Sequence, residues 1–183
     1  NAIIFEYQLL VETWNKELSH LYQGISDDGS CIEIAPTDKE WKYASGSHIV
    51  KPGERFKWTL KIAKWSSCAS IIIGLLPNVN DLFNVTQPKP LRLMHKWWKQ
   101  GYMFSGVSGQ FAAYGQNIKK NGMYAQDSTF AKEGDVLEID LNCNEGTLHF
   151  IANGRDWGNA LVDDSGENVE LNKDEELRLA LCV

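Results

Sequence analysis

The order of apolar and polar residues changes once along the chain. From Ile3 to Trp14 the apolar residues recur at steps of three and four, as on one face of a helix. After Trp14 the dominant period is two, which is typical of strands with one buried and one exposed face. The pattern predicts a single domain over residues 1–183, with an N-terminal helical arm at 1–14 and a β-rich body at 15–183. The arm either packs on the body or ends a helical region further upstream.

The clearest alternation lies at residues 55–62, 137–151 and 177–181. Within 137–151, two alternating stretches are separated by a short loop that contains glycine, which predicts a hairpin. Asn153-Gly154 follows directly and supplies the positive φ angles of a tight turn. We therefore expect a third strand to fold back at this turn, and a final strand to reach the C-terminus.

Other segments complete the predicted sheets. Residues 70–76 (SIIIGLL) are apolar without alternation, which predicts a central strand covered on both faces. Residues 30–34, 102–107 and 110–114 are further short candidates. Many short strands separated by turns favour an all-β sandwich of two packed antiparallel sheets. The stretch 77–100 has no clean period and contains three prolines, and long irregular loops of this kind tend to carry function.

Composition supports a folded domain and limits its partners. The 183 residues are 43% hydrophobic and 23% charged, within the globular range. A formal net charge of −6 and a pI near 5.2 leave no basic footprint, so nucleic acid is not an expected partner. The apolar run at residues 3–5 is interrupted by Glu6, so neither a signal peptide nor a membrane-spanning segment is expected.

The cysteines and the first residue bear on the setting of the domain. Cys31, Cys68, Cys143 and Cys182 are far apart and form no C-x-x-C pair. Two disulfides are possible in principle, but reduced, partly buried thiols suit a chain of this size better and point to the cytoplasm. Because the chain starts at Asn1 rather than Met, we expect a domain of a larger protein. We also expect this domain to be monomeric.

A search for catalytic or metal-binding motifs finds little. The sequence has no G-x-S-x-G, H-E-x-x-H, P-loop or G-x-G-x-x-G pattern, and its four histidines are isolated from one another. The acidic runs at 27–28, 163–164 and 174–176 could be calcium ligands or a glycosidase pair, but acidic loop residues near glycine are more simply turn formers. We therefore expect no enzyme, no cofactor and no metal site.

Several motifs, in a consistent order, resemble the SPRY family. Residues 53–62 (GERFKWTLKI) and 70–74 (SIIIG) are similar to two of its strands. The strongest block is 133–161, EGDVLEIDLNCNEGTLHFIANGRDWGNAL, with its Gly-Asp opening, G-T-L-x-F strand and Asn-Gly turn. Trp14-Asn15 followed by 26–29 (SDDG) resembles the first hairpin of SPRY adaptors of ubiquitin ligases.

The sequence also departs from the family pattern. Trp58-Thr59-Leu60 stands where W-E-V is usual, the last strand lacks the common proline, and the loop after Gly74 is long. These departures leave the subfamily open.

The resemblance implies a bent, concanavalin-like sandwich whose loops at one end bind a short peptide or a folded partner surface. The matching loops follow Trp14, surround 41–43 and follow Gly74. The candidate contacts are Lys16, Glu17, Lys42, Tyr43, Asp81, Phe83, Trp97 and Trp98. At least one of the two neighbouring tryptophans could instead belong to the core, and Trp157 could either cap the core or edge the site.

Three classes of function are compared on these grounds. The favoured hypothesis is a non-catalytic recognition module for a protein partner, within a larger scaffold or ubiquitin-ligase protein. The alternative is a lectin-like sandwich, since lectins share the two-sheet architecture and place exposed tryptophan against sugar rings. An enzyme is disfavoured because no set of reactive groups emerges from the sequence.

Overall fold

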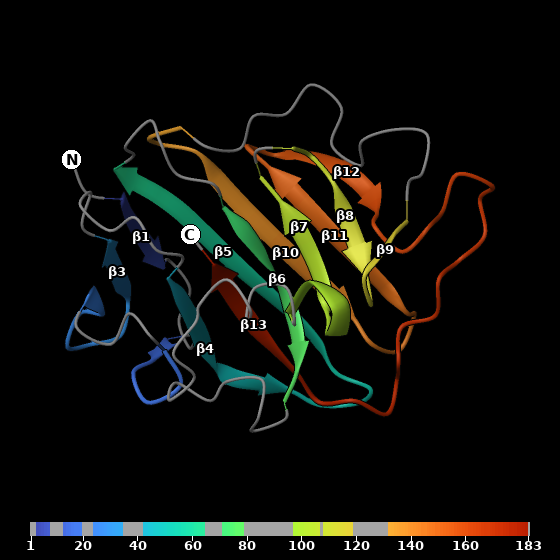
Figure 1. The fold of residues 1–183 in the computed structure, drawn as a ribbon, viewed down its shortest axis with the longest axis horizontal. Coiled ribbons are helices and arrows are strands. Elements are labelled where there is room, and N and C mark those ends of the chain that lie inside the picture. The colour runs from blue at the N-terminus through green and yellow to red at the C-terminus, as the bar shows by residue number, and fades with distance from the viewer. Residues whose placement is uncertain are drawn as a thin grey trace.

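The computed structural model describes residues 3–7, 13–19, 24–34, 42–64, 71–78, 97–106, 108–118 and 132–182. Within these ranges the chain forms two antiparallel sheets (Figure 1). The six-stranded sheet has the order β12 (Arg155–Asn159), β11 (Thr147–Ala152), β10 (Val136–Asn142), β5 (Arg55–Lys64), β1 (Ile3–Tyr7), β3 (Cys31–Ile34). The seven-stranded sheet has the order β2 (Trp14–Asn15), β4 (Tyr43–Val50), β13 (Leu177–Cys182), β6 (Ile72–Pro77), β7 (Tyr102–Ser105), β8 (Phe111–Ala113), β9 (Gln116–Asn117). The predicted all-β sandwich is confirmed.

The hairpin of β10 and β11 forms as its alternation predicts. Leu137 pairs with Ala152 and Asn142 with Thr147, and buried and partly exposed residues alternate along both strands. Asn153 and Gly154 adopt φ angles of 51° and 77°, and β12 folds back from this turn. Left-handed φ angles at both positions are what a tight hairpin turn requires, so the turn residues fix the register.

The continuously apolar segment becomes β6, which pairs with β13 on one edge and β7 on the other. Both of its faces are largely buried, as predicted. β13 lies between β4 and β6 and is buried along its whole length. Its alternating residues therefore face two different apolar layers rather than core and solvent.

The predicted N-terminal helix is wrong where the structure describes it. Ile3–Tyr7 forms strand β1, inserted between β5 and β3, and Trp14–Asn15 forms β2 in the other sheet. Phe5 pairs with both Ile32 and Ile62. The apolar spacing of this segment is compatible with either element over so short a length, and pairing with two distant strands decides for the strand. In the described part of the chain, α-helix occurs only at residues 97–100.

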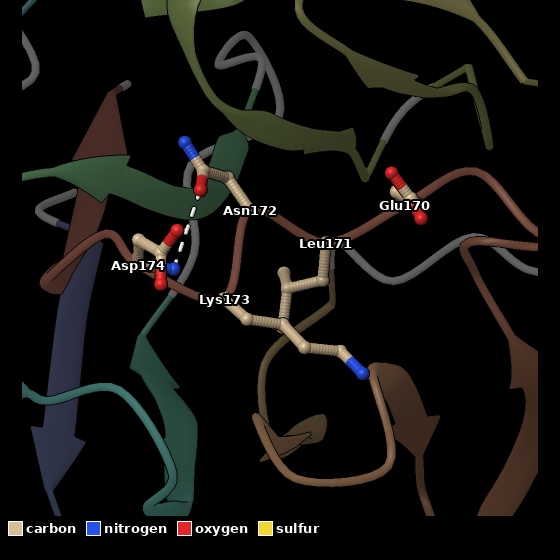
Figure 2. A pocket seen from close by; sticks show the side chains of 5 residues that line it. All are labelled: Glu170, Leu171, Asn172, Lys173 and Asp174. Atoms are coloured by element: carbon tan, nitrogen blue, oxygen red, sulfur yellow. Dashed lines mark hydrogen bonds between the residues drawn. The ribbon is translucent and has the colours of Figure 1, made fainter.

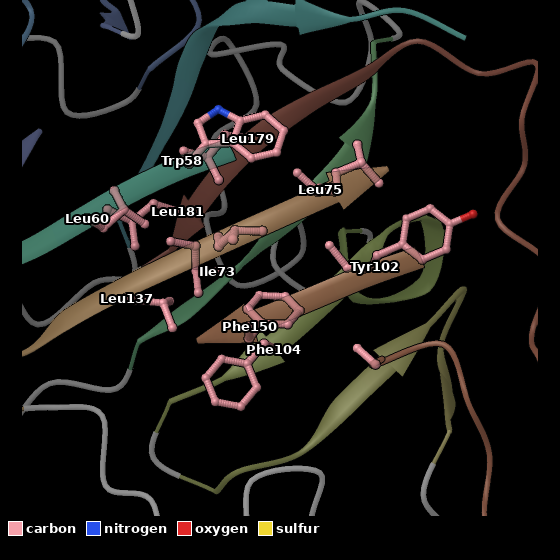
Figure 3. Close-up of a cluster of buried hydrophobic side chains, with 14 of the residues drawn as sticks. Trp58, Leu60, Ile73, Leu75, Tyr102, Phe104, Leu137, Phe150, Leu179 and Leu181 are labelled. Carbon is pink, nitrogen blue, oxygen red and sulfur yellow. The ribbon is translucent and has the colours of Figure 1, made fainter. Parts of the chain in front are cut away.

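The main core lies between the two sheets. Aromatic and aliphatic side chains from both sheets meet there, among them Trp58, Phe104 and Phe150, all fully buried (Figure 3). Burying side chains of this size stabilises the fold by roughly 1.5–3 kcal/mol each. This layer holds the sandwich together.

A second, smaller apolar cluster lies on the other face of the seven-stranded sheet. In β13, Leu179 and Leu181 belong to the main core, whereas Ala180 and Cys182 belong to the second cluster. We call this group the outer cluster. It consists of Tyr43, Leu76, Trp97, Met103, Ala180 and Cys182, with Leu18, Ile72 and Trp98 packed against it. The 97–100 helix contributes its two tryptophans and lies in front of the sheet in Figure 1.

Candidate functional site

The turn after β2 is fixed to the seven-stranded sheet by one buried hydroxyl. Ser19, 1% exposed, donates its Oγ hydrogen to the carbonyl oxygen of Asn15 at 2.5 Å and accepts the backbone N–H of Ser45 at 3.0 Å. The Asn15 Oδ1 accepts the backbone N–H of Leu18 at 3.0 Å. These bonds satisfy the polar groups of the turn and hold it in one conformation.

Lys16 and Glu17 project into solvent from this turn. The Lys16 Nζ lies 3.2 Å from Asp27 Oδ1, in an exposed ion pair. Exposed ion pairs contribute little to folding stability, so Lys16 can exchange its contact with Asp27 for a contact with a partner protein. The turn thus presents charged residues from a fixed backbone.

The neighbouring acidic turn has a structural role. The Asp28 Oδ1 accepts hydrogen bonds from the Ser26 hydroxyl and from the hydroxyl and backbone N–H of Ser30. These bonds stabilise the carboxylate and lower the pKa of Asp28 to about 2. The carboxylate of Asp28 is thus engaged by hydrogen bonds within its own turn, as in a turn former.

Tyr43 and Trp97 lie beneath the surface. Their rings meet edge to face with centroids 5.3 Å apart, and they are 3% and 1% exposed. Burial, with a smaller contribution from Cys182, raises the pKa of Tyr43 to about 12, so its hydroxyl stays protonated. Both were predicted to contact a partner, but the structure places them in the outer cluster, where they support the surface instead.

Leu18 and Trp98 form the apolar part of that surface. Each is half-buried and packs against the outer cluster, Leu18 from the first turn and Trp98 from the 97–100 helix. Lys42, partly exposed, directly precedes Tyr43. We define the candidate surface as Lys16, Glu17, Leu18, Lys42 and Trp98.

Six of the eight predicted contacts therefore gather around the outer cluster, four at the surface and two below it. Asp81 and Phe83 lie outside the described residues. Leu18 was missed by the sequence reasoning. The sequence signal that could have found it is an apolar residue in a turn, between Glu17 and Ser19.

The start of β7 fixes the helix that carries Trp98. A Cβ atom at Gly101 would lie 2.4 Å from Leu76 Cδ2 and 2.6 Å from the carbonyl oxygen of Leu75. Only glycine allows the chain to pass this close to β6. The close approach sets the position of the 97–100 helix against the sheet.

A buried arginine supports the same face. Arg178, 5% exposed, donates from Nη1 to the carbonyl oxygens of Gly46 at 2.8 Å and Ser47 at 3.1 Å. Its Nε and Nη2 donate to Asn78 Oδ1 at 3.3 Å and 3.1 Å. It thereby ties together an irregular part of β4 and the residue that follows β6. Sequence alternation gave no sign of this role.

The remaining sequence candidates have structural roles. Trp157 packs on Phe104 of the main core, with ring centroids 5.2 Å apart, so it caps the core. The His149 Nδ1 lies 3.0 Å from an Asp156 carboxylate oxygen on the outer side of the six-stranded sheet. Within the described ranges, no three or more His, Cys, Asp or Glu side chains are grouped to hold a metal ion.

Two further observations concern the setting. Cys31, Cys143 and Cys182 are thiols rather than disulfides, and Cys143 and Cys182 are buried; Cys68 lies outside the described residues. The part of the chain that the structure describes has no helix of the length and hydrophobicity needed to cross a bilayer.

The arrangement of the sheets has counterparts among solved structures. No family model matches the chain, and no curated protein matches its sequence. The SPRY domain of human HERC1 is similar with a TM-score of 0.55 and 15% sequence identity, over 92% of this chain and 88% of that one. The fold is SPRY-like. The NEUZ (NHR) domain of Neuralized from Drosophila melanogaster is also similar, with a TM-score of 0.52 and 12% identity over 94% of this chain and 84% of that one.

The SPRY-like fold confirms the resemblance that the sequence motifs indicated. At sequence identities of 15% and 12%, these two structures show the fold that the chain shares with them. Function has to be argued from the residues of the SPRY-like sandwich itself, because one fold supports many functions.

Proposed function

We propose that this SPRY-like domain is a non-catalytic protein-interaction module that binds a peptide segment or a partner surface through the candidate surface. The domain would work inside a larger cytoplasmic scaffold or ubiquitin-ligase protein. The expected contacts are Lys16, Glu17, Leu18, Lys42 and Trp98, together with Asp81 and Phe83 from the long loop.

The contact between Tyr43 and Trp97 is the observation that carries this proposal. It joins β4 to the 97–100 helix, while Leu18 brings the first turn onto the same cluster. Three segments far apart in sequence thus form one surface over a packed layer. A preformed surface loses little conformational entropy on binding, which favours recognition.

The chemistry of the surface suits a protein partner. Trp98 is half-buried, so it can bury further area while its position is held by the outer cluster. Tryptophan anchors of this kind contribute much of the energy of interfaces, and charges at the rim govern orientation and the rate of encounter. Lys16, Glu17 and Lys42 would supply those charges.

A pull-down with matched variants tests the proposal. The variant combines Lys16→Ala, Glu17→Ala and Trp98→Ala, and the control combines Lys132→Ala and Glu133→Ala, an adjacent exposed Lys–Glu pair on a different turn. We expect proteins bound by the unaltered domain to be lost with the variant and kept by the control. Circular dichroism and thermal unfolding establish that both variants fold.

Two results would count against the proposal. If the variant and the control retain the same bound proteins, the candidate surface is not the site. If glycans on an array quench the tryptophan fluorescence of the unaltered domain and the variant loses this response, the lectin-like alternative takes its place.

A further inference from the structure

The tight turn between β11 and β12 is an Asn-Gly pair, which is chemically labile. In such a pair the backbone nitrogen of the glycine can attack the side-chain amide of the asparagine, because glycine has no Cβ atom to hinder the approach. Asn153 and Gly154 are both exposed, so water and hydroxide reach them. The turn that sets the register of this hairpin is therefore open to chemical modification.

The nitrogen of Gly154 is accessible to the neighbouring amide. Its N–H donates no hydrogen bond within the described residues, and a Cβ atom built at Gly154 would meet none of their atoms within 4 Å. The turn at the other end of β11 is more crowded. A Cβ atom at Gly146 would lie 3.5 Å from Cε of Lys173, one of the residues that line the hollow in Figure 2.

The side-chain amide of Asn153 is engaged at both of its polar atoms. Its Oδ1 accepts the backbone N–H of Val136 at 2.9 Å, and its Nδ2 donates to Asp135 Oδ1 at 3.0 Å. The first bond stabilises the negative charge that develops on the oxygen when a nucleophile attacks the carbonyl carbon. The second places a carboxylate beside the reacting groups, where its charge opposes an anionic nitrogen at Gly154. One contact thus favours the attack and the other restrains it.

We propose that Asn153 is a deamidation site in the folded domain and that Asp135 sets the rate of the reaction. The Gly154 nitrogen loses its proton to hydroxide and bonds to Asn153 Cγ, the bond from Cγ to Nδ2 breaks, and ammonia leaves with a proton taken from water. Water then opens the succinimide ring at either carbonyl and leaves aspartate or isoaspartate at position 153. The site belongs to the six-stranded sheet, whereas the candidate surface lies over the seven-stranded one, so the inference does not rest on the proposed function.

Both products alter the turn. Aspartate places a carboxylate oxygen where Nδ2 was, 3.0 Å from Asp135 Oδ1, so two negative charges face each other. Isoaspartate also lengthens the backbone of the turn, which sets the pairing of Ala152 with Arg155. β12 is an edge strand and carries Trp157, which caps the main core. Deamidation therefore loosens this edge of the sandwich and acts as an irreversible timer on the domain.

Peptide mapping by mass spectrometry tests the reaction in the folded domain, incubated at mildly alkaline pH in ¹⁸O-labelled water. The reference is a synthetic peptide of residues 148–159. We expect ¹⁸O-labelled product at Asn153, formed more slowly than in the peptide because two hydrogen bonds restrict the amide. We expect none at Asn144, which Glu145 follows. Asn121-Gly122 lies outside the described residues and is mapped separately. An unmodified Asn153 after the peptide has reacted fully would overturn the proposal.

Asp135→Asn tests the assigned control of the rate. It removes the charge and keeps an acceptor oxygen for the backbone N–H of Lys132. We expect deamidation at Asn153 to become about fivefold faster, the scale of one unit charge acting over about 4 Å in water. Glu133→Gln is the control, because it removes an exposed charge from the same turn, and it should change the rate less. Equal rates in the two variants would show that Asp135 has no special role.

Asn153→Asp reproduces one product and tests the loosening of β12. We expect faster amide hydrogen exchange at residues 155–157 than in Asn153→Gly, which keeps the turn conformation and loses the same hydrogen bonds without adding a charge. Adding Asp135→Asn to Asn153→Asp should restore slow exchange, because a donor again faces a carboxylate. If Asn153→Asp exchanges as slowly as the unaltered domain, the product does not loosen the edge and the timer is wrong.

Discussion

At the scale of single residues, Arg178 shows how a buried charge can organise a surface it does not belong to. Its guanidinium donates to two carbonyl oxygens of β4 and to the side chain of Asn78. A buried charge of this kind is stable only when its donors are satisfied, and the acceptors lose their partners if it is removed.

Arg178→Met tests this role. We expect the variant to lower the free energy of unfolding by about 2–4 kcal/mol, because the Gly46, Ser47 and Asn78 oxygens all lose a charged donor at once. The matched control is Arg155→Met on the exposed strand β12, which should change stability by less than about 0.5 kcal/mol. Urea unfolding followed by tryptophan fluorescence measures both. Equal effects of the two substitutions would mean that the hydrogen bonds of Arg178 contribute nothing specific.

The ion pair of Arg55 and Asp140 makes stability depend on pH. Arg55 donates to both carboxylate oxygens, at 3.1 Å and 2.8 Å, and this hydrogen bonding is the main cause of the lowered pKa of Asp140. A carboxyl group with a lower pKa in the folded state stabilises the fold above its unfolded-state pKa. That contribution is lost as the pH falls through the folded-state value.

Asp140→Asn should therefore destabilise the domain near neutral pH and not below both pKa values. The effect will be small, because Arg55 is largely exposed. Urea unfolding of the two proteins at a series of pH values would show the difference narrowing as the pH falls. A difference that is constant with pH would assign the effect to packing rather than to charge.

At the scale of elements, local patterns predicted the strands whose partners are close in sequence. The β10–β11–β12 meander follows from alternation and from the Asn153-Gly154 turn, both of which act over a few residues. The local pattern did not predict β1, because whether this segment forms a strand depends on its pairing with β3 and β5, which begin more than twenty residues away. The five residues of β1, with Glu6 among them, carry too little period to decide their own secondary structure.

Phe5→Pro is the decisive variant for β1. Proline cannot donate a backbone hydrogen bond and disrupts a strand that is paired on both edges, so we expect a loss of about 3 kcal/mol or more. Phe5→Leu keeps the backbone donor and is the control. If hydrogen exchange at Lys61, whose partner in β1 is Glu6, is equally slow in both variants, β1 does not pair as described and the helical arm has to be reconsidered.

At the scale of the whole molecule, the sequence predicted the sandwich but not the layer on its outer face. The sequence of β13 alternates and that of β6 is continuously apolar, yet neither pattern says what covers the second face of the sheet. The outer cluster depends on where Leu18, Tyr43 and Trp97 arrive in space, which is a property of the tertiary fold. For the same reason, the sequence could not tell that Tyr43 and Trp97, two of the predicted contacts, lie beneath the surface.

The two apolar layers have different roles, so we expect truncation of a tryptophan in each layer to change stability by different amounts. Trp58 fills the main core between the sheets, so Trp58→Ala should cost about 3–5 kcal/mol and threaten folding as a whole. Trp97 packs in a smaller cluster that half-buried residues cover, where the neighbours can collapse more easily, so Trp97→Ala should cost less, about 1–3 kcal/mol.

Trp97→Ala should nevertheless weaken partner binding as strongly as Trp98→Ala does, because it removes the support that fixes the candidate surface. Urea unfolding combined with capture of the proteins bound by the unaltered domain measures both effects. If Trp97→Ala lowers stability and leaves binding intact, the outer cluster stabilises the fold but does not support the binding site.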